Sequence, residues 1–247
     1  MRRSKMPVVV AMIFSLFAIA CGDRTSGVGE LGRVQYAIHT HYVVEDAQLE
    51  DVEIVTGHPQ FFNTSLTDKG KKGGTEPDDL KHRVTPSDGV NISNDGTGDF
   101  TIDVAEPGEY TIETLKDGDV YDYIEIAFDE PTKLSLVTWT LGPNDEDWTK
   151  REGSGSVKVK PGTQATFVPV PKDADGNRLV GDVQTTLEAS PEDAVASGEN
   201  VIEVYEQRVV SLSSPVTIFF LEEAEVEVKL TDESNDVSGA RSFNVQD

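Results

Sequence analysis

Hydrophobic and polar residues alternate with a period of two along most of the chain that follows its N-terminal segment. Such a period is typical of β-strands that bury one face. The clearest strand candidates are rich in β-branched and aromatic residues and lie at 100–104, 109–115, 121–128, 133–141, 216–220 and 225–230. Turn-forming sequences such as EPG, KDGD and DEP separate many of them. The only candidate for helix is one turn within 75–83, so the pattern predicts an all-β protein.

The N-terminal segment has a different pattern. Arg2, Arg3 and Lys5 precede an apolar run at 8–20 that only Ser15 interrupts. Thirteen residues are too few to cross a hydrocarbon core of about 30 Å as a helix. The basic start, the short apolar run and the small residues at 18–20 predict a secretory signal peptide at 1–20. An uncleaved anchor is the less favoured alternative.

Cys21 is the only cysteine of the chain, and it directly follows this segment. The sequence AIAC at 18–21 resembles the lipobox of bacterial lipoproteins, although Ala18 stands where that motif prefers leucine. The resemblance implies that the Cys21 thiol is acylated, for example with palmitate, and becomes the first residue of the mature chain. The alternative is a soluble secreted protein with an exposed thiol, which is a liability in an oxidising compartment. Gly22, rather than aspartate, follows the cysteine, so the resemblance favours the outer membrane.

Loss of the signal peptide makes an acidic chain more acidic. Removal of three of the 21 Lys and Arg leaves 18 against 45 Asp and Glu, a formal charge of −27. Such a surface repels nucleic acid and anionic lipid headgroups. We therefore expect no nucleic-acid partner, and attachment to the membrane through the lipid alone. The charge also leaves open the binding of divalent cations.

The mature chain is predicted to hold two domains after a flexible tether at 21–30, which is rich in glycine. An internal repeat sets the number of domains: residues 100–128 align with 216–245 with one inserted residue, and apolar positions match across three strands. Chance similarity between two β-meanders is the alternative. A real repeat places the last three strands of one domain in each copy, with domains at 31–133 and 134–247.

The second domain carries a family resemblance of its own. Residues 155–195 contain a Pro-Gly turn, an apolar strand, a D-x-x-G-N turn, a second strand and a Ser-Pro segment. This order resembles bacterial immunoglobulin-like repeats of surface proteins. The resemblance implies two tandem immunoglobulin-like β-sandwich domains, the first joined to the family only through the internal repeat.

One turn of that repeat is a candidate metal site. Asp173, Asp175 and Asn177 alternate around Gly176, as do the first oxygen ligands of calcium loops. The glutamate that closes such loops is missing, because Gln184 stands at its position. Asp-Gly and Gly-Asn are also common in simple hairpin turns. A hairpin turn is therefore the favoured interpretation, Ca²⁺ is the only cofactor considered, and no other is expected.

Other candidate sites lack essential partners. His39 and His41 share one face of a predicted strand, but no third zinc ligand follows at a fixed spacing. Trp139 and Trp148 flank an acidic loop and could stack on a sugar, although Trp139 alternates with core positions and is expected to be buried. No nucleophile with a base at suitable spacing is recognisable, so we expect no enzyme.

Two hypotheses remain. The favoured one is a non-enzymatic, membrane-anchored envelope lipoprotein whose immunoglobulin-like domains act as spacers or bind another cell-surface or envelope protein. The alternative is a lipoprotein that captures a divalent cation or a carbohydrate. Fold alone does not choose between them.

Overall fold

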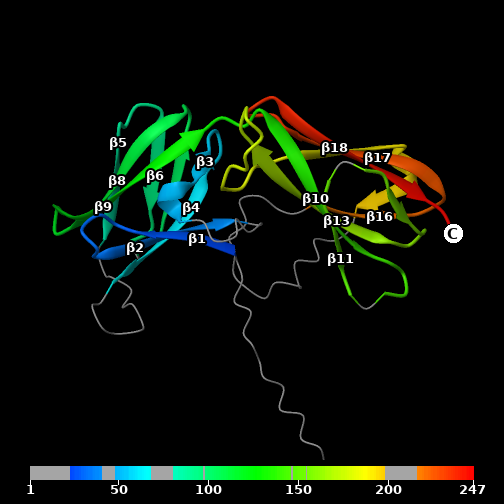
Figure 1. Cartoon of the computed structure of the whole chain (residues 1–247), viewed down its shortest axis with the longest axis horizontal. Coiled ribbons are helices and arrows are strands. Elements are labelled where there is room, and N and C mark those ends of the chain that lie inside the picture. The colour runs from blue at the N-terminus through cyan, green and yellow to red at the C-terminus, as the bar shows by residue number, and fades with distance from the viewer. Residues whose placement is uncertain are drawn as a thin grey trace, which may run out of the picture.

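The computed structural model describes residues 23–40, 48–67, 80–96, 98–145, 147–153, 155–197 and 216–247, and these form two β-sandwiches arranged end to end (Figure 1). Strands before residue 130 form the first sandwich, strands from residue 133 on form the second, and no sheet of the described chain contains strands of both. Two short 3₁₀ turns, η1 (Leu49–Asp51) and η2 (Glu192–Ala194), accompany the strands. None of the described residues belongs to a helix that is long and apolar enough to cross a membrane.

The first sandwich consists of a five-stranded and a four-stranded sheet. The five-stranded sheet has the order β1 (Asp23–Val28), β2 (Val34–Thr40), β4 (Gln60–Leu66), β7 (Phe100–Val104) and β6 (Val90–Asn94). The four-stranded sheet has the order β3 (Glu53–Val55), β9 (Asp119–Asp129), β8 (Gly108–Lys116) and β5 (Lys81–Thr85).

The second sandwich repeats this plan. Its five-stranded sheet has the order β11 (Thr149–Arg151), β10 (Lys133–Leu141), β13 (Gln164–Lys172), β16 (Val216–Phe220) and β15 (Val195–Ser197). Its four-stranded sheet has the order β12 (Val157–Val159), β18 (Val237–Val245), β17 (Ala224–Asp232) and β14 (Thr186–Ser190).

Both sandwiches have the immunoglobulin strand order. With seven strands labelled A to G in chain order, one sheet of each reads A-B-E-D and the other G-F-C. A further short strand, β3 or β12, pairs in parallel with strand G. One extra edge strand, β1 or β11, pairs antiparallel with strand A. The chain therefore folds into two tandem immunoglobulin-like β-sandwiches, as the pattern and the family resemblance predicted.

The internal repeat corresponds to strands E, F and G of each sandwich. Ile102 in β7 matches Ile218 in β16, and Ile112 in β8 matches Val228 in β17. All four side chains are buried in the core of their own sandwich. The period-two match thus reflects equivalent positions in two copies of one fold.

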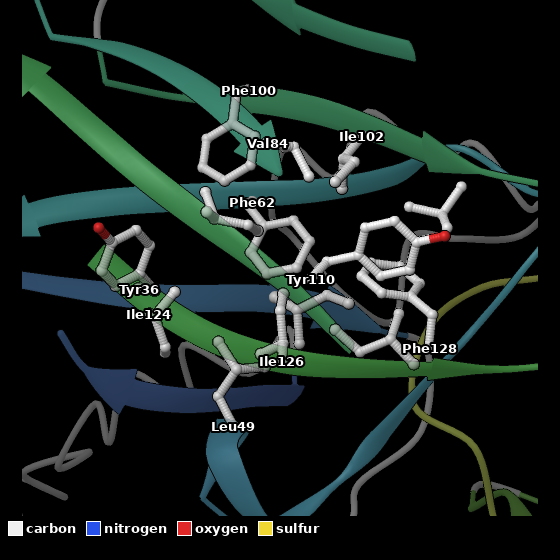
Figure 2. Packing of buried hydrophobic residues seen from close by; sticks show 14 of the residues in the cluster. Tyr36, Leu49, Phe62, Val84, Phe100, Ile102, Tyr110, Ile124, Ile126 and Phe128 are labelled. Atoms are coloured by element: carbon white, nitrogen blue, oxygen red, sulfur yellow. The ribbon is translucent and has the colours of Figure 1, made fainter. Parts of the chain in front are cut away.

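Aromatic side chains fill the first core (Figure 2). The rings of Phe62 and Phe100 stack with centroids 5.0 Å apart, and Tyr110 meets Phe128 edge to face at 5.5 Å. The Tyr110 hydroxyl donates a hydrogen bond of 2.8 Å to the carbonyl of Glu106, four residues upstream. A tyrosine of strand F that binds the backbone just before its strand is the tyrosine corner of immunoglobulin-like folds.

The predicted tether at 21–30 is wrong for most of its length. Residues 23–28 form β1, which pairs with β2 from Asp23 opposite Thr40 to Val28 opposite Gln35. The glycines of this segment lower its β-propensity, but backbone pairing with a neighbouring strand outweighs it. Cys21, Gly22 and the signal peptide lie outside the described residues.

Candidate functional site: the junction between the two sandwiches

The junction begins with a strand-like backbone contact. Residues 178–183 of the second sandwich lie along the outer edge of β3 in the first. The Val55 amide donates to the Val180 carbonyl at 2.9 Å, and the Val180 amide donates to the Glu53 carbonyl at 2.8 Å. The Val180 side chain is buried in the core of the first sandwich. This loop therefore closes an edge that would otherwise expose unpaired backbone groups.

A small apolar cluster lies beside this contact. Val55 of the first sandwich packs with Leu134, Leu179 and Val183 of the second, and all four are buried. Val237, at the start of β18, packs against the cluster. Burial of a valine or leucine stabilises by about 1.5–3 kcal/mol relative to exposure. Separation of the two sandwiches would expose these side chains together.

A glutamine side chain pairs with backbone of the loop. Gln60 Nε2 donates to the Asp182 carbonyl at 3.0 Å, and Gln60 Oε1 accepts from the Asp182 amide at 2.9 Å. Gly181, which directly precedes Asp182, has a φ of +113°. A Cβ at that position would collide with the Gln60 amide group, so the close approach requires glycine.

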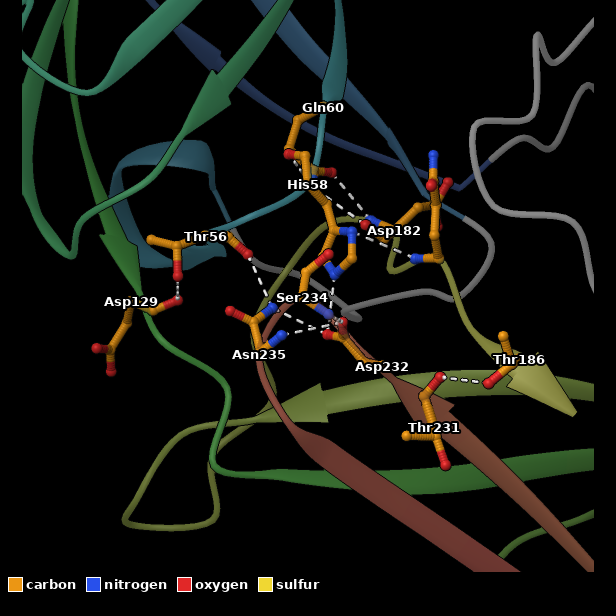
Figure 3. Close-up of polar contacts among 11 residues, drawn as sticks. Thr56, His58, Gln60, Asp129, Asp182, Thr186, Thr231, Asp232, Ser234 and Asn235 are labelled. Atoms are coloured by element: carbon orange, nitrogen blue, oxygen red, sulfur yellow. Dashed lines mark hydrogen bonds and ion pairs between the residues drawn. The ribbon is translucent and has the colours of Figure 1, made fainter. Parts of the chain in front are cut away.

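A buried histidine and a buried aspartate form the centre of the junction (Figure 3). His58 Nε2 lies 2.8 Å from Asp232 Oδ2, with the side chains only 3% and 0% exposed. Asp232 also accepts hydrogen bonds from the amides of Ser234 and Asn235 and from Asn235 Nδ2. Asn235 Nδ2 in turn donates to the carbonyl of Thr56 in the first sandwich. The β17–β18 turn is thus bound to the segment before β4.

These contacts determine what the pair can do. His58 Nδ1 lies 3.5 Å from the Gln184 amide, which donates to it, so the Nε2 proton is directed at Asp232. Burial opposes the charge on Asp232, but the hydrogen bonds from His58 and Asn235 outweigh it and hold the pKa of this carboxyl below its ordinary value. Because both ring nitrogens are engaged and the side chain is buried, the histidine is placed as a structural contact and not as a general base.

A group of carboxylates lies on the same junction. Glu53, Asp129 and Asp173 each bring one oxygen within 4.8 Å of the others. Desolvation by the surrounding protein, followed by repulsion from Asp129, Asp173 and Asp175, raises the pKa of Glu53. Three carboxylate oxygens at this spacing have the chemistry that calcium prefers. Asp173 is buried, Asp129 half-buried and Glu53 exposed.

The predicted loop itself is a hairpin turn. Asp173 Oδ1 accepts from the Asn177 amide at 2.7 Å, and Asp173 Oδ2 accepts from Asn177 Nδ2 at 2.8 Å. Burial raises the pKa of Asp173, but these hydrogen bonds outweigh it, so the pKa lies below its ordinary value. Asp175 is exposed and lies outside the carboxylate group. Asp173 is thus hydrogen-bonded to Asn177 within the turn, and its carboxylate neighbours are Glu53 and Asp129 rather than Asp175.

The remaining candidates are dispersed. His39 belongs to β2, but its side chain and all of His41 lie outside the described residues. Trp139 is half-buried and packs on Val137, Val168 and Val170, on the face of β10 opposite Leu136 of the core. The expectation that Trp139 is buried is therefore met only in part. Lys150 Nζ lies 5.8 Å from the centre of its ring, which is a cation–π contact.

Few residues of the junction can be recognised from sequence. His58 lies between glycine and proline in a turn, and Asp232 lies in an ordinary hairpin sequence. The one available signal is Gln60, which occupies an inward position of β4 next to Phe62 and is 1% exposed. A polar residue at a core position requires a buried partner, but sequence does not identify that partner.

Comparisons with known proteins return matches among solved structures. No family model matches the chain, and no curated protein matches it. The Escherichia coli adhesin FdeC is 15% identical with a TM-score of 0.30, covering 87% of this chain and 74% of that one. Domains 5–6 of the S-layer protein SbsC are 13% identical with a TM-score of 0.32, covering 91% and 99%. A C-terminal fragment of intimin, solved with the intimin-binding domain of its receptor Tir, is 11% identical with a TM-score of 0.27, covering 76% and 60%.

Proposed function

We propose that this chain is a non-enzymatic lipoprotein of the cell envelope, anchored by acylated Cys21. Its two immunoglobulin-like domains are held together as one rigid unit. Such a unit serves as a spacer or as a module that binds another envelope or cell-surface protein. The outer membrane is the proposed location. The lipobox-like sequence at 18–21 supports the anchor.

The observation that carries the rigid unit is the buried junction. Tandem domains joined by a short linker move freely unless their interface is extensive and apolar. Here the interface combines two backbone hydrogen bonds, an apolar cluster and the His58–Asp232 pair. A fixed angle between domains lowers the entropy lost when both contact one partner, which suits a binding module.

Detergent partition tests the anchor. Wild type expressed in a bacterial host with its signal peptide is expected to incorporate labelled palmitate and to enter the detergent phase. Cys21→Ser is expected to stay in the aqueous phase, with Ser26→Ala as a matched control that partitions like wild type. Equal partition of wild type and Cys21→Ser would refute the lipid anchor.

Spin labels test the rigid unit. Cysteines replace Asp119 and Glu222, both exposed, in the soluble Cys21→Ser protein, and pulsed EPR measures the distance between them. One narrow distance distribution is expected for two sandwiches at a fixed angle. A broad distribution would show that the domains move independently and would remove the support for a rigid module.

A further inference from the structure

Strand β1 leaves almost no free chain between Cys21 and the folded protein. The strand begins at Asp23, so Gly22 is the only residue between them. Two successive Cα–Cα steps of about 3.8 Å span no more than about 8 Å. A lipid on Cys21 therefore lies close to the place where β1 begins.

The direction of β1 fixes where that place is. Val34, at the start of β2, lies at the outer end of the first sandwich, where its amide donates to Asp122 just after the β8–β9 hairpin. Thr40, at the other end of β2, lies toward the junction, and Asp23 pairs with Thr40. β1 thus begins on the junction side of its sandwich, as Figure 1 shows near the middle of the molecule.

We propose that the lipid anchor holds this protein at its waist, which is the region where the two sandwiches meet. The bilayer surface then lies beside the start of β1, and the two sandwiches extend from it in opposite directions. This inference rests on the proposed lipidation of Cys21. An immunoglobulin-like chain anchored at one end would instead stand as a stalk with its second domain farthest from the membrane.

The dimensions make the difference large. At 3.3–3.4 Å per residue, the eleven residues of β9 span about 35 Å. The outer tip of the first sandwich, at Asp119, therefore lies about 35 Å from the junction end of β9. Gly22, the single linker residue, is too short to bridge that distance. The outer tip of the second, at Glu222, lies beyond the start of β17, at the end remote from Asp232 and the junction. Waist anchoring puts both tips farther from the lipid than β1 itself.

Energy transfer to labelled lipids measures this geometry. Because the native thiol is acylated, a cysteine introduced for Gln48, Asp119 or Glu222 is the only thiol of the lipidated protein. Gln48 is exposed and bridges to Ser26 of β1. Each labelled protein is reconstituted into phosphatidylcholine vesicles that carry an acceptor lipid. We expect the highest transfer from position 48 and lower transfer from both tips.

A lengthened linker provides the control. Twenty Gly and Ser residues inserted between Gly22 and Asp23 keep the lipid but free the waist, so transfer from position 48 is expected to fall to the level of the tips. Higher transfer from position 119 than from position 48, or no response to the inserted linker, would overturn waist anchoring while the lipid anchor stands. Failure of wild type to bind the vesicles would overturn both.

Discussion

His58 Nε2 and Asp232 Oδ2 lie 2.8 Å apart although 174 positions separate the two residues, and both side chains are buried. One residue precedes β4 of the first sandwich and the other ends β17 of the second. The pair therefore couples two domains that the sequence pattern presented as independent. The two sandwiches, one beginning with β1 at Asp23 and the other with β10 at Lys133, would each expose one half of this contact if expressed singly.

The coupling is measurable by a double-mutant cycle of His58→Ala and Asp232→Asn. Each single change leaves the other residue buried without its hydrogen-bond partner. Each is therefore expected to lower the free energy of unfolding by about 1–3 kcal/mol. The pair is expected to show an interaction energy on the order of 1–3 kcal/mol in urea denaturation. Strictly additive losses would show that the contact contributes nothing to stability.

Tyr110→Phe tests the tyrosine corner. Loss of the hydrogen bond to the Glu106 carbonyl is expected to lower the free energy of unfolding by about 0.5–1.5 kcal/mol, because the ring still fills the core. Tyr121→Phe is the matched control, since Tyr121 is half-buried at the sandwich edge between Arg33 and Lys116. Equal effects of the two changes would contradict a special role for Tyr110.

His82 makes stability depend on pH. Burial lowers its pKa from 6.5 to about 4, against an opposing hydrogen bond with Asn94, and its ring stacks on Phe100 at 4.2 Å. The unfolded chain thus binds this proton more tightly, and stability falls as the pH drops from about 6.5 to about 4. The loss should be on the order of 2–3 kcal/mol.

The His82→Gln variant isolates this contribution. Its free energy of unfolding, measured in urea between pH 7.5 and pH 4.5, is expected to decline less steeply than that of wild type. Parallel curves for the two proteins would assign the pH dependence to other groups.

Substitutions in the hairpin at 173–177 distinguish a simple turn from a cation site. Asp173→Ala removes two hydrogen bonds to Asn177 and is expected to lower the melting temperature by several degrees, whereas Asp175→Ala, at an exposed position, is expected to be neutral. Calcium and sodium chloride are expected to stabilise wild type only in proportion to ionic strength, by screening its acidic surface. A rise at sub-millimolar calcium that Asp173→Ala abolishes would instead establish a calcium site with Glu53 and Asp129.

The strands at 100–141 and 216–230 and the presence of two copies of one fold could be predicted from letters, because period-two burial and turn chemistry are local properties that repeat in both copies. Ile102 and Ile218, for example, could be aligned from letters alone and occupy equivalent core positions. Strand β1 could not be predicted, because its glycine and polar residues pair with β2 through backbone groups and leave no pattern of side chains in the sequence. The junction, by contrast, becomes visible only in the folded protein, since the partners of His58, Gln60 and Asp173 come from the other sandwich or from distant turns. Contacts between separate chain segments leave no period in the sequence.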